Sequence, residues 1–444
     1  MNLRKLSGCL TAVLICTASA WGATANWPQF RGPDASGVAE GATAPAEWSE
    51  TQNVRWTRDV PGRGWSSPIV WGNRVFLTAV VNHGQSEEIK RGLYLGGERP
   101  NPSSAVHEWL VYCLNLDDGE VVWKVCVHEG VPQGTVHLKN SYASETPVTD
   151  GERLYCYFGN VGIFCFDMEG QAVWTKKLPT ANTANNWGTG ASPTLFENRL
   201  FVPVDNAEES YLVALDSRSG DEVWRVERGR QSNWATPFVW RSDQRTELVA
   251  LSSGLAEGLD LDGHQLWRFG GMPGNTISTP FSSHGLLILA AGPPIERVRP
   301  LLAIRPGASS DVSLAPDQTA NQYVVWYQKF AGSYNTSPIV YGDNLYVLYD
   351  GGALACFDAR SGKEIYKKTR LPNGRAFTAS PWAYDGKLFC LSEYGDTFVI
   401  QAGPEFKLLH VNHLEGEPLC MATPAIAGDK LLIRTDAKVY CIAR

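Results

Sequence analysis

A Ser-Pro or Thr-Pro pair recurs eight times along the chain, and this recurrence limits the fold more than any other feature. Five of the seven intervals between the prolines are 43 to 46 residues long, and the two longer ones, of 79 and 58 residues, contain insertions at 81–107 and 293–323. Regular self-similarity at this period indicates a repeat architecture. The eight prolines are Pro68, Pro147, Pro193, Pro237, Pro280, Pro338, Pro381 and Pro424.

Each copy reads as four short strands, and most copies end in the same signal. The third copy, residues 191–224, contains apolar and aromatic runs separated by turn residues, which is typical of antiparallel strands. Its Gly220 precedes Trp224 by four residues, and this spacing recurs in other copies. Because one indole buries about 150–250 Å², we interpret the closing aromatic residues as contacts between neighbouring repeats. These residues are Trp56, Trp123, Trp174, Trp224, Trp267, Trp326 and Tyr366.

The two ends of the chain complete each other. The last copy opens at Pro424 and the chain ends at Arg444 without a closing strand, whereas residues 54–60 contain a Trp strand with no copy before them. We therefore predict an all-β fold over residues 54–444, an eight-bladed β-propeller of four-stranded antiparallel blades. The N-terminal strand is expected to pair into the last blade, because a closed ring leaves no long exposed sheet edge.

Residues 1–25 have the pattern of a secretory signal peptide. Arg4 and Lys5 precede an apolar run over 10–15, and small residues follow. Cleavage after Ala20 and after Ala25 fits equally well. A lipid-attachment-like box at 6–9 precedes the apolar run instead of following it, and we interpret it as accidental. The chain is thus expected to be exported, periplasmic or extracellular, with residues 26–53 forming an extended segment packed on the propeller.

Composition excludes two classes of partner. The net charge is −7 and no basic run is present, which argues against nucleic acid. No later apolar stretch reaches 18 residues, so the mature chain is not expected to span a membrane.

Eight cysteines follow residue 25, and Cys126 and Cys420 receive no role. Cys156 with Cys165 is the pair that a disulfide would most readily join. Four cysteines share the repeat position of Ala214 and are expected to be buried thiols: Cys113, Cys165, Cys356 and Cys441.

The segments before the Ser/Thr-Pro pairs carry the candidate ligand site. Each joins an outer strand to the innermost strand of the next blade, so all eight are expected on one face around the central channel. Their amides and aromatic rings suit a polar, planar or carbohydrate-like ligand, or an extended peptide. Alternatively, the asparagines satisfy turn backbone groups. The loop over 81–107 is expected to shield this face. The candidates are His137, Lys139, Asn140, Glu145, Trp187, Asn233, Trp234, Asn275, Asn335 and Arg375.

The pattern Leu-Asp-x-x-x-Gly-x-x-x-Trp at 215–224 resembles the repeat of pyrroloquinoline-quinone-type propellers. That family includes quinoprotein alcohol and glucose dehydrogenases, and also the non-enzymatic propeller lipoprotein of the outer-membrane barrel-assembly machinery. The resemblance covers residues 54–444. The stretches 27–33, 137–140 and 144–147 resemble a narrower group of exported bacterial propellers.

The resemblance implies two functions. The dehydrogenases hold their quinone between a Trp and a disulfide of adjacent cysteines, with calcium nearby, and this sequence has no adjacent cysteines. We therefore expect a monomeric, non-enzymatic binding or scaffolding propeller for a protein, peptide or glycan, with no cofactor or metal. The alternative is a dehydrogenase of alcohols or sugars that uses pyrroloquinoline quinone and calcium. Trp187 or Trp234 would then be the floor, and Glu145 with Asn140 would face calcium.

Overall fold

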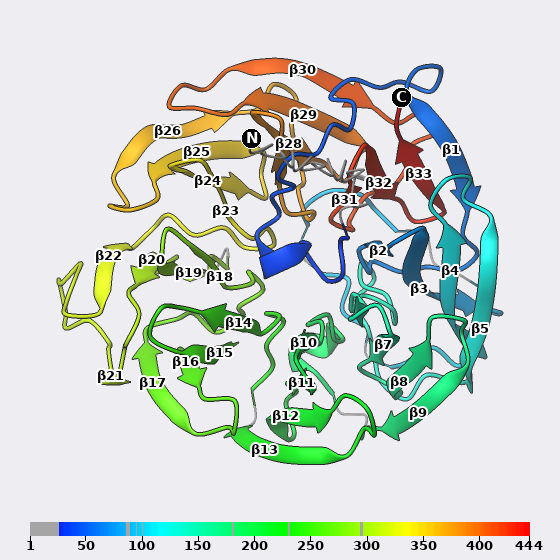
Figure 1. Cartoon of the computed structure of the whole chain (residues 1–444), viewed down its shortest axis with the longest axis horizontal. Helices are drawn as coiled ribbons and strands as arrows, with labels where there is room; N and C mark the ends of the chain where they lie inside the picture. The colour runs from blue at the N-terminus through cyan, green and yellow to red at the C-terminus, as the bar shows by residue number, and fades with distance from the viewer. Residues whose placement is uncertain are drawn as a thin grey trace, which may run out of the picture.

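The computed structural model describes residues 26–444 except 86–88, 95, 100, 180–181, 230 and 294–295, so the predicted signal peptide lies outside the described residues. Eight antiparallel sheets are arranged around a central axis, as Figure 1 shows, and the predicted eight-bladed propeller is confirmed. The described helices are two short 3-10 turns, η1 (Pro33–Ala35) and η2 (Ala184–Asn186). Neither these nor any other described segment forms an apolar helix of membrane-spanning length.

The strands nearest the axis are short, and those next to them are buried. The innermost strands are β2 (Ile69–Trp71), β6 (Val148–Thr149), β10 (Thr194–Phe196), β14 (Phe238–Arg241), β18 (Phe281–Ser283), β23 (Ile339–Tyr341), β27 (Trp382–Tyr384) and β31 (Ala425–Ala427). The second strands are β3 (Arg74–Asn82), β7 (Arg153–Phe158), β11 (Arg199–Val204), β15 (Thr246–Ser252), β19 (Leu286–Ala290), β24 (Asn344–Tyr349), β28 (Lys387–Leu391) and β32 (Lys430–Arg434).

The third strands are buried too, because neighbouring blades cover both faces of each sheet, whereas the outer strands alternate in exposure. The third strands are β4 (His107–Asn115), β8 (Gly162–Asp167), β12 (Ser210–Asp216), β16 (Leu255–Leu259), β20 (Leu301–Ile304), β25 (Ala353–Asp358), β29 (Asp396–Gln401) and β33 (Lys438–Ile442). The outer strands are β5 (Val121–Gly130), β9 (Ala172–Lys177), β13 (Glu222–Gly229), β17 (Gln265–Gly270), β22 (Val324–Gln328), β26 (Glu364–Arg370), β30 (Leu408–His413) and β1 (Val54–Asp59).

The ring closes as the two chain ends predict. Strand β1 pairs antiparallel with β33, with Trp56 opposite Cys441, and completes the sheet β1-β33-β32-β31. The main-chain N–H of Val60 donates to the carbonyl oxygen of Ala437 just beyond the strand pair. The last blade is thus built from both ends of the propeller.

The repeated Ser/Thr-Pro pair joins neighbouring blades near the axis. The inner edge of an innermost strand has no neighbouring strand, so its N–H groups need other acceptors. In six junctions the main-chain N–H of one Ser or Thr donates to the hydroxyl of the equivalent residue in the next blade, at 2.9–3.0 Å. The following Pro has no N–H to satisfy. The donor–acceptor pairs are Ser67–Thr146, Thr146–Ser192, Ser192–Thr236, Thr279–Ser337, Ser337–Ser380 and Ser380–Thr423.

A different contact joins the first and last blades. The hydroxyl of Ser67 is buried without a hydrogen-bond partner. Beside it, the buried guanidinium of Arg434 in the last blade donates to the carbonyl oxygens of Ser66 at 2.9 Å and Thr78 at 2.7 Å in the first blade. Burial lowers the pKa of Arg434 to about 9. One side chain therefore bridges this junction.

The Gly-x-x-x-Trp spacing docks neighbouring blades at five junctions among the described residues. Gly170 has a φ of +84°, and a Cβ on it would lie 2.7 Å from the indole of Trp123 in the preceding blade. The same indole donates its Nε1–H to the carbonyl oxygen of Met168 at 3.0 Å. The glycine thus provides both the turn and a flat surface for the ring. The same contact joins Trp56 to Gly119, Trp174 to Gly220, Trp224 to Gly263 and Trp326 to Gly362.

Trp267 does not follow the predicted docking pattern. Its indole donates to Glu247 of its own blade and is buried in a hydrophobic cluster that includes Leu302 and Val324 of the next blade. The next blade has Gln322 at the glycine position. Instead, β21 (Ser310–Asp311), from the insertion, pairs in parallel with β17 as a fifth strand. Tyr366 contacts the next blade edge to face through Phe406, with ring centroids 6.1 Å apart.

The cysteines of the described chain are free, and all but Cys126 are buried. Their predicted equivalence is confirmed, because Cys113, Cys165, Cys356 and Cys441 lie directly across from a closing aromatic residue, as Ala214 does. Cys165 pairs with Tyr155 in the strand register, so the adjacent Cys156 points to the other face of the sheet. This geometry separates the two thiols.

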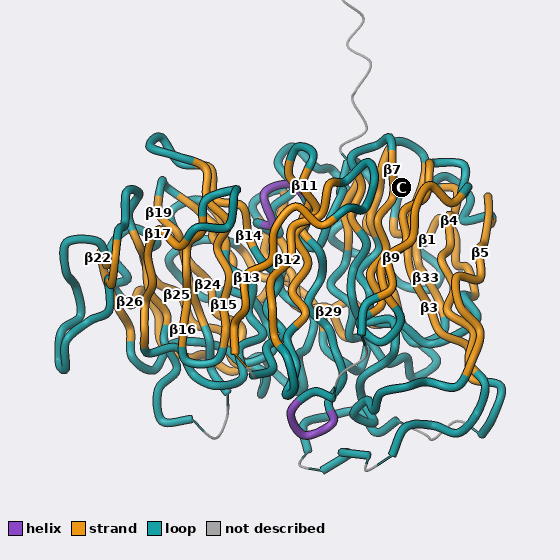
Figure 2. Tube along the Cα trace, turned by 90° about the horizontal axis from the view of Figure 1, so that it is seen from below, coloured by secondary structure: helices purple, strands orange, loops and turns teal. Residues whose placement is uncertain are grey.

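The N-terminal segment crosses one face of the propeller, seen at the top of Figure 2. Trp27 forms a bridge with Val70 in the first blade, and Ala39 donates its N–H to the carbonyl oxygen of Ala383 in the seventh. Trp27 and Trp48 are buried in the same hydrophobic cluster as the last blade. The connections between consecutive blades lie on the opposite face, which we call the mouth face.

Candidate functional site

The central channel is narrow and receives side chains from every blade. A cavity of about 130 Å³ is bordered by Trp65, Trp234 and Asn335, together with the hydroxyl residues of the Ser/Thr-Pro pairs. Phe30 of the N-terminal segment lines the same cavity. Two of the predicted ligand residues, Trp234 and Asn335, therefore border the channel.

The insertion of the first blade lies across the mouth face as a strap, defined here as the described part of residues 89–99. The Gly92 N–H donates to Glu393 Oε2 at 2.9 Å, and the Gly92 carbonyl oxygen accepts from Lys139 Nζ at 3.0 Å. Lys139 Nζ and Glu393 Oε1 are themselves 2.6 Å apart, and Glu393 is fully buried. Thr378 donates its hydroxyl to the same carboxylate. Main-chain groups of the strap are thus held by an ion pair that joins the second and seventh blades.

His137 holds the next part of the strap. Its Nδ1 accepts the main-chain N–H of Lys139 at 3.1 Å, so its Nε2 carries the proton and donates to the Gly96 carbonyl oxygen at 2.9 Å. The Leu138 N–H donates to the Gly97 carbonyl oxygen at 2.8 Å. The ring of His137 stacks on Tyr94, at 6.3 Å between centroids.

Asn140, Trp187 and Trp234 stabilise the connections of the mouth face. Asn140 Nδ2 donates to the carbonyl oxygens of Trp187 at 2.8 Å and Thr189 at 3.0 Å, while its Oδ1 accepts from Ser141 and Ser144. The two indoles lie 5.4 Å apart with their planes at 46°. Trp234 donates its indole N–H to a main-chain carbonyl oxygen. The Asn140 amide therefore binds main-chain groups of the connections, which agrees with the alternative interpretation of these asparagines.

Arg375 contacts the ring of Tyr394 together with a residue of the strap. Its guanidinium stands 4.1 Å from the ring centroid of Tyr394, and that of Arg91, from the strap, stands 5.3 Å from it. Arg375 is exposed, and Asn275 is half-buried.

Glu145 is buried between the second and third blades. Its carboxylate accepts the Gly159 N–H at 3.3 Å and a hydrogen bond from the Thr189 side chain, and burial raises its pKa to about 7. The ordinary value is 4.5. The carboxyl therefore takes up a proton within the neutral pH range.

This shift predicts a pH-dependent effect of Glu145→Gln. The folded state binds the proton more tightly than the unfolded state, so the free energy of unfolding of the native protein falls as pH rises from about 4.5 to about 7. The substitution removes the buried charge. We expect Glu145→Gln to raise the free energy of unfolding at pH 8 by about 2–3 kcal/mol relative to the native protein. Denaturant titrations at pH 8 and pH 4.5 measure it.

The increase in the free energy of unfolding caused by Glu145→Gln should be absent at pH 4.5, where the carboxyl of Glu145 in the native protein is protonated. The exposed Glu152→Gln is the matched control and should have little effect at either pH. An equal effect of Glu145→Gln at both pH values would show that burial of the charge is not its cause.

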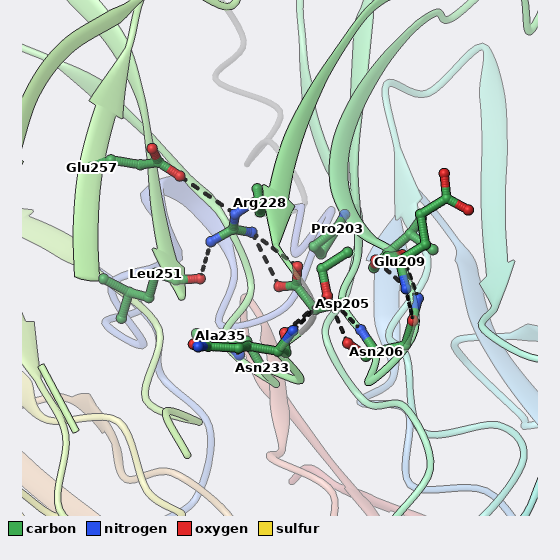
Figure 3. Close-up of polar contacts among 12 residues, drawn as sticks. Pro203, Asp205, Asn206, Glu209, Arg228, Asn233, Ala235, Leu251 and Glu257 are labelled. Carbon is green, nitrogen blue, oxygen red and sulfur yellow. Dashed lines mark hydrogen bonds and ion pairs between the residues drawn. The ribbon is translucent and has the colours of Figure 1, made fainter. Parts of the chain in front are cut away.

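A second buried charge cluster joins the third and fourth blades (Figure 3). Arg228 at the end of β13 lies 3.0 Å from Asp205 Oδ2 and 3.4 Å from Glu257 Oε1, and it also donates to the Leu251 carbonyl oxygen. Burial raises the pKa of Asp205 to about 6. Nearby, Asn233 accepts the Ala235 N–H at 2.7 Å, and its Nδ2 is buried without a partner. Three charges meet here to connect two blades.

The sequence analysis did not predict a role for Glu393 or Arg228. For Glu393, one sequence signal was present. An acidic residue stands 12 positions after the repeat proline in four copies, and it recurs at the turn between the second and third strands. In the sixth copy it accepts the main-chain N–H groups of Tyr334 and Asn335. In the seventh, the longer Glu393 reaches the strap. The four residues are Asp205, Asp350, Glu393 and Asp436.

The central channel differs from the quinone and calcium site that the resemblance implies. The channel cavity of about 130 Å³ is below the ~300–1,000 Å³ typical of small-molecule sites. Trp187 and Trp234 are tilted against each other and offer no flat floor, and Glu145 is enclosed by blade contacts. Among the described residues, no three His, Cys, Asp or Glu side chains are placed to hold a metal ion.

Comparison with known proteins identifies relatives of the fold. A curated relative from Shewanella oneidensis, outer membrane protein assembly factor BamB, is 24% identical over 262 residues, which are 56% of this chain and 61% of that protein. The chain thus spans about three fifths of the relative's length. The crystal structure of BamB from Moraxella catarrhalis has a TM-score of 0.54 at 14% identity, covering 76% of this chain and 91% of that one.

The quinohemoprotein alcohol dehydrogenase of Comamonas testosteroni has a TM-score of 0.60 at 11% identity, covering 96% of this chain and 81% of that one. At such identities the structures show the fold alone. A family model described as outer membrane protein assembly factor BamB matches residues 107–368, more than half of the chain. The chain therefore belongs to this family of pyrroloquinoline-quinone-like propellers.

Proposed function

We propose that this chain is an exported, non-enzymatic scaffolding propeller that binds a polypeptide partner on its mouth face. One observation carries the proposal: the polar side chains gathered there bind main-chain groups. Lys139, Glu393 and His137 all contact peptide N–H or carbonyl groups of the strap. Such a face is suited to recognise protein. The name of the curated relative, an assembly factor, supports the same class of role.

The second candidate is a quinone-dependent dehydrogenase of alcohols or sugars, because a quinohemoprotein enzyme shares the fold. The small channel cavity and the tilted indoles favour the scaffold. In the proposed role the protein acts as a monomer outside the cytoplasmic membrane, in the periplasm or beyond. It requires no cofactor, metal or nucleic acid.

Site-specific photo-crosslinking in the native host tests the scaffold. A photoreactive residue replaces Leu93 on the strap or Arg375 on the mouth face, and Arg241 on the opposite face serves as the matched position. We expect one discrete protein adduct from the two mouth positions and none from Arg241. The same adduct from both faces, or no adduct, would contradict the role of the mouth face.

A biochemical assay tests the dehydrogenase. The purified protein is incubated with calcium and pyrroloquinoline quinone, and binding is measured by calorimetry, followed by assays with alcohols and sugars and an artificial electron acceptor. We expect neither binding nor turnover. Stoichiometric binding with turnover that disappears in Glu145→Gln or Trp187→Ala would replace the scaffold with the enzyme.

A further inference from the structure

We propose that the mouth face binds an extended, glycine-containing segment of a partner polypeptide at the place where the strap now lies. The strap is then an intramolecular occupant of the ligand site. This inference rests on the proposed function and specifies the chemistry of the partner: a peptide main chain with two glycines and an aromatic residue between them.

The first support is the clamp on Gly92. Both polar groups of this one residue are bound, the N–H by the Glu393 carboxylate and the carbonyl oxygen by the Lys139 ammonium. Hydrogen bonds to ionised groups are the stronger class, and they strengthen further out of water. The Lys139 side chain is 14% exposed and that of Glu393 is fully buried. The pair therefore recognises the main-chain N–H and carbonyl groups of the bound residue.

The second support is the continuation of main-chain recognition along the strap. His137 and Leu138 bind the carbonyl oxygens of Gly96 and Gly97. A carbohydrate offers hydroxyls and no peptide carbonyls in this arrangement. Backbone contacts spread over several residues are the mode by which proteins bind extended peptides.

The glycines define which segments fit. At Gly97, where φ is +104°, a Cβ would lie 2.6 Å from Nε2 of His137. At Gly92, where φ is +105°, a Cβ would lie 3.2 Å from the hydroxyl of Tyr394. Both positions therefore favour glycine because their φ is positive, and the position of Gly97 also excludes a side chain on steric grounds. Between them, the ring of Tyr94 stacks on His137, with the Lys139 ammonium 5.7 Å from its centroid.

The strap fills this site incompletely, which makes it replaceable. The Tyr94 hydroxyl is buried without a hydrogen-bond partner, and burial raises its pKa. The Leu93 side chain is 53% exposed. A buried unpaired hydroxyl opposes the closed arrangement, so a segment with phenylalanine at this place and a covered apolar side chain would bind better.

The test uses a synthetic peptide with the sequence of residues 89–98, IKRGLYLGGE, and the mature protein. In the variants Gly97→Val and Gly92→Val the tethered strap can no longer occupy its site. Because the tethered strap competes in the native protein, we expect the peptide to bind each variant at least tenfold more tightly than the native protein. Fluorescence anisotropy measures affinity, and hydrogen exchange at the strap verifies its release. Circular dichroism verifies that each variant is folded.

Further variants locate the bound peptide. In the Gly97→Val background, Glu393→Gln should weaken binding at least tenfold, whereas the exposed Glu120→Gln should leave it unchanged. A peptide with valine at the position of Gly97 should not bind. Failure of the peptide to bind either strap-released variant, or binding that survives Glu393→Gln, overturns the inference. If mouth positions still crosslink a partner while the peptide fails to bind, only this inference falls and the scaffold proposal stands.

Discussion

A chain that begins at Pro61 is expected not to fold cooperatively. It lacks β1, so β33 loses its outer neighbouring strand and the last blade keeps the three strands β33, β32 and β31. It also lacks three buried tryptophans, Trp27, Trp48 and Trp56. Their burial contributes on the order of 10 kcal/mol by area, an upper bound comparable with the whole stability of a typical domain. Near-ultraviolet circular dichroism during heating measures the effect.

The matched control is the chain that begins at Asn26, which lacks only the predicted signal peptide. It should unfold in one cooperative transition. If the shorter chain melts within about 5 °C of this control, then β1 and the N-terminal segment are accessory and the closure adds little.

Arg228→Met is expected to lower the free energy of unfolding by about 3–5 kcal/mol at pH 8, because it leaves the buried carboxylates of Asp205 and Glu257 unpaired. Urea titration measures the change. Arg225→Met, on the same strand, is the control: its ion pair with Glu222 is partly exposed, and its loss should cost less than about 2 kcal/mol.

The cost of Arg228→Met should fall at pH 5. The pKa of Asp205 is about 6 in the folded protein, and loss of the arginine removes the cation that holds it down. A protonated Asp205 carries no buried charge. If the two pH values give the same loss, or if Arg225→Met costs as much, the cluster does not act through paired charges.

The fold could be predicted almost completely from the sequence because repetition supplies its own check. Eight Ser/Thr-Pro pairs fix the number of blades, and the unpaired Trp strand at 54–60 fixes the closure. The exception was Trp267, whose environment depends on what the next blade presents. An insertion there changed the partner without changing the tryptophan.

The candidate site was predictable only as a face. Connectivity alone places the segments between blades at the mouth, so the neighbourhood of Lys139 and His137 could be named. Their partners could not, because Lys139 pairs directly with Glu393, which is 254 residues away in the sequence, and both contact a strap with no repeat pattern. The spacing of residues in the sequence predicts contacts within one repeat. The contact between Lys139 and Glu393 depends on how the ring brings distant blades together.

The closure of the ring determines how the molecule responds to a mechanical force. Six of the junctions carry neutral links that all run in one direction around the axis. Between the last and first blades, the guanidinium of Arg434 donates to two carbonyl oxygens instead. The chain ends themselves meet inside the last blade, where β1 pairs with β33, so a pulling force between Val54 and Arg444 would load the hydrogen bonds of this strand pair first, beginning at Val54 and Ile442.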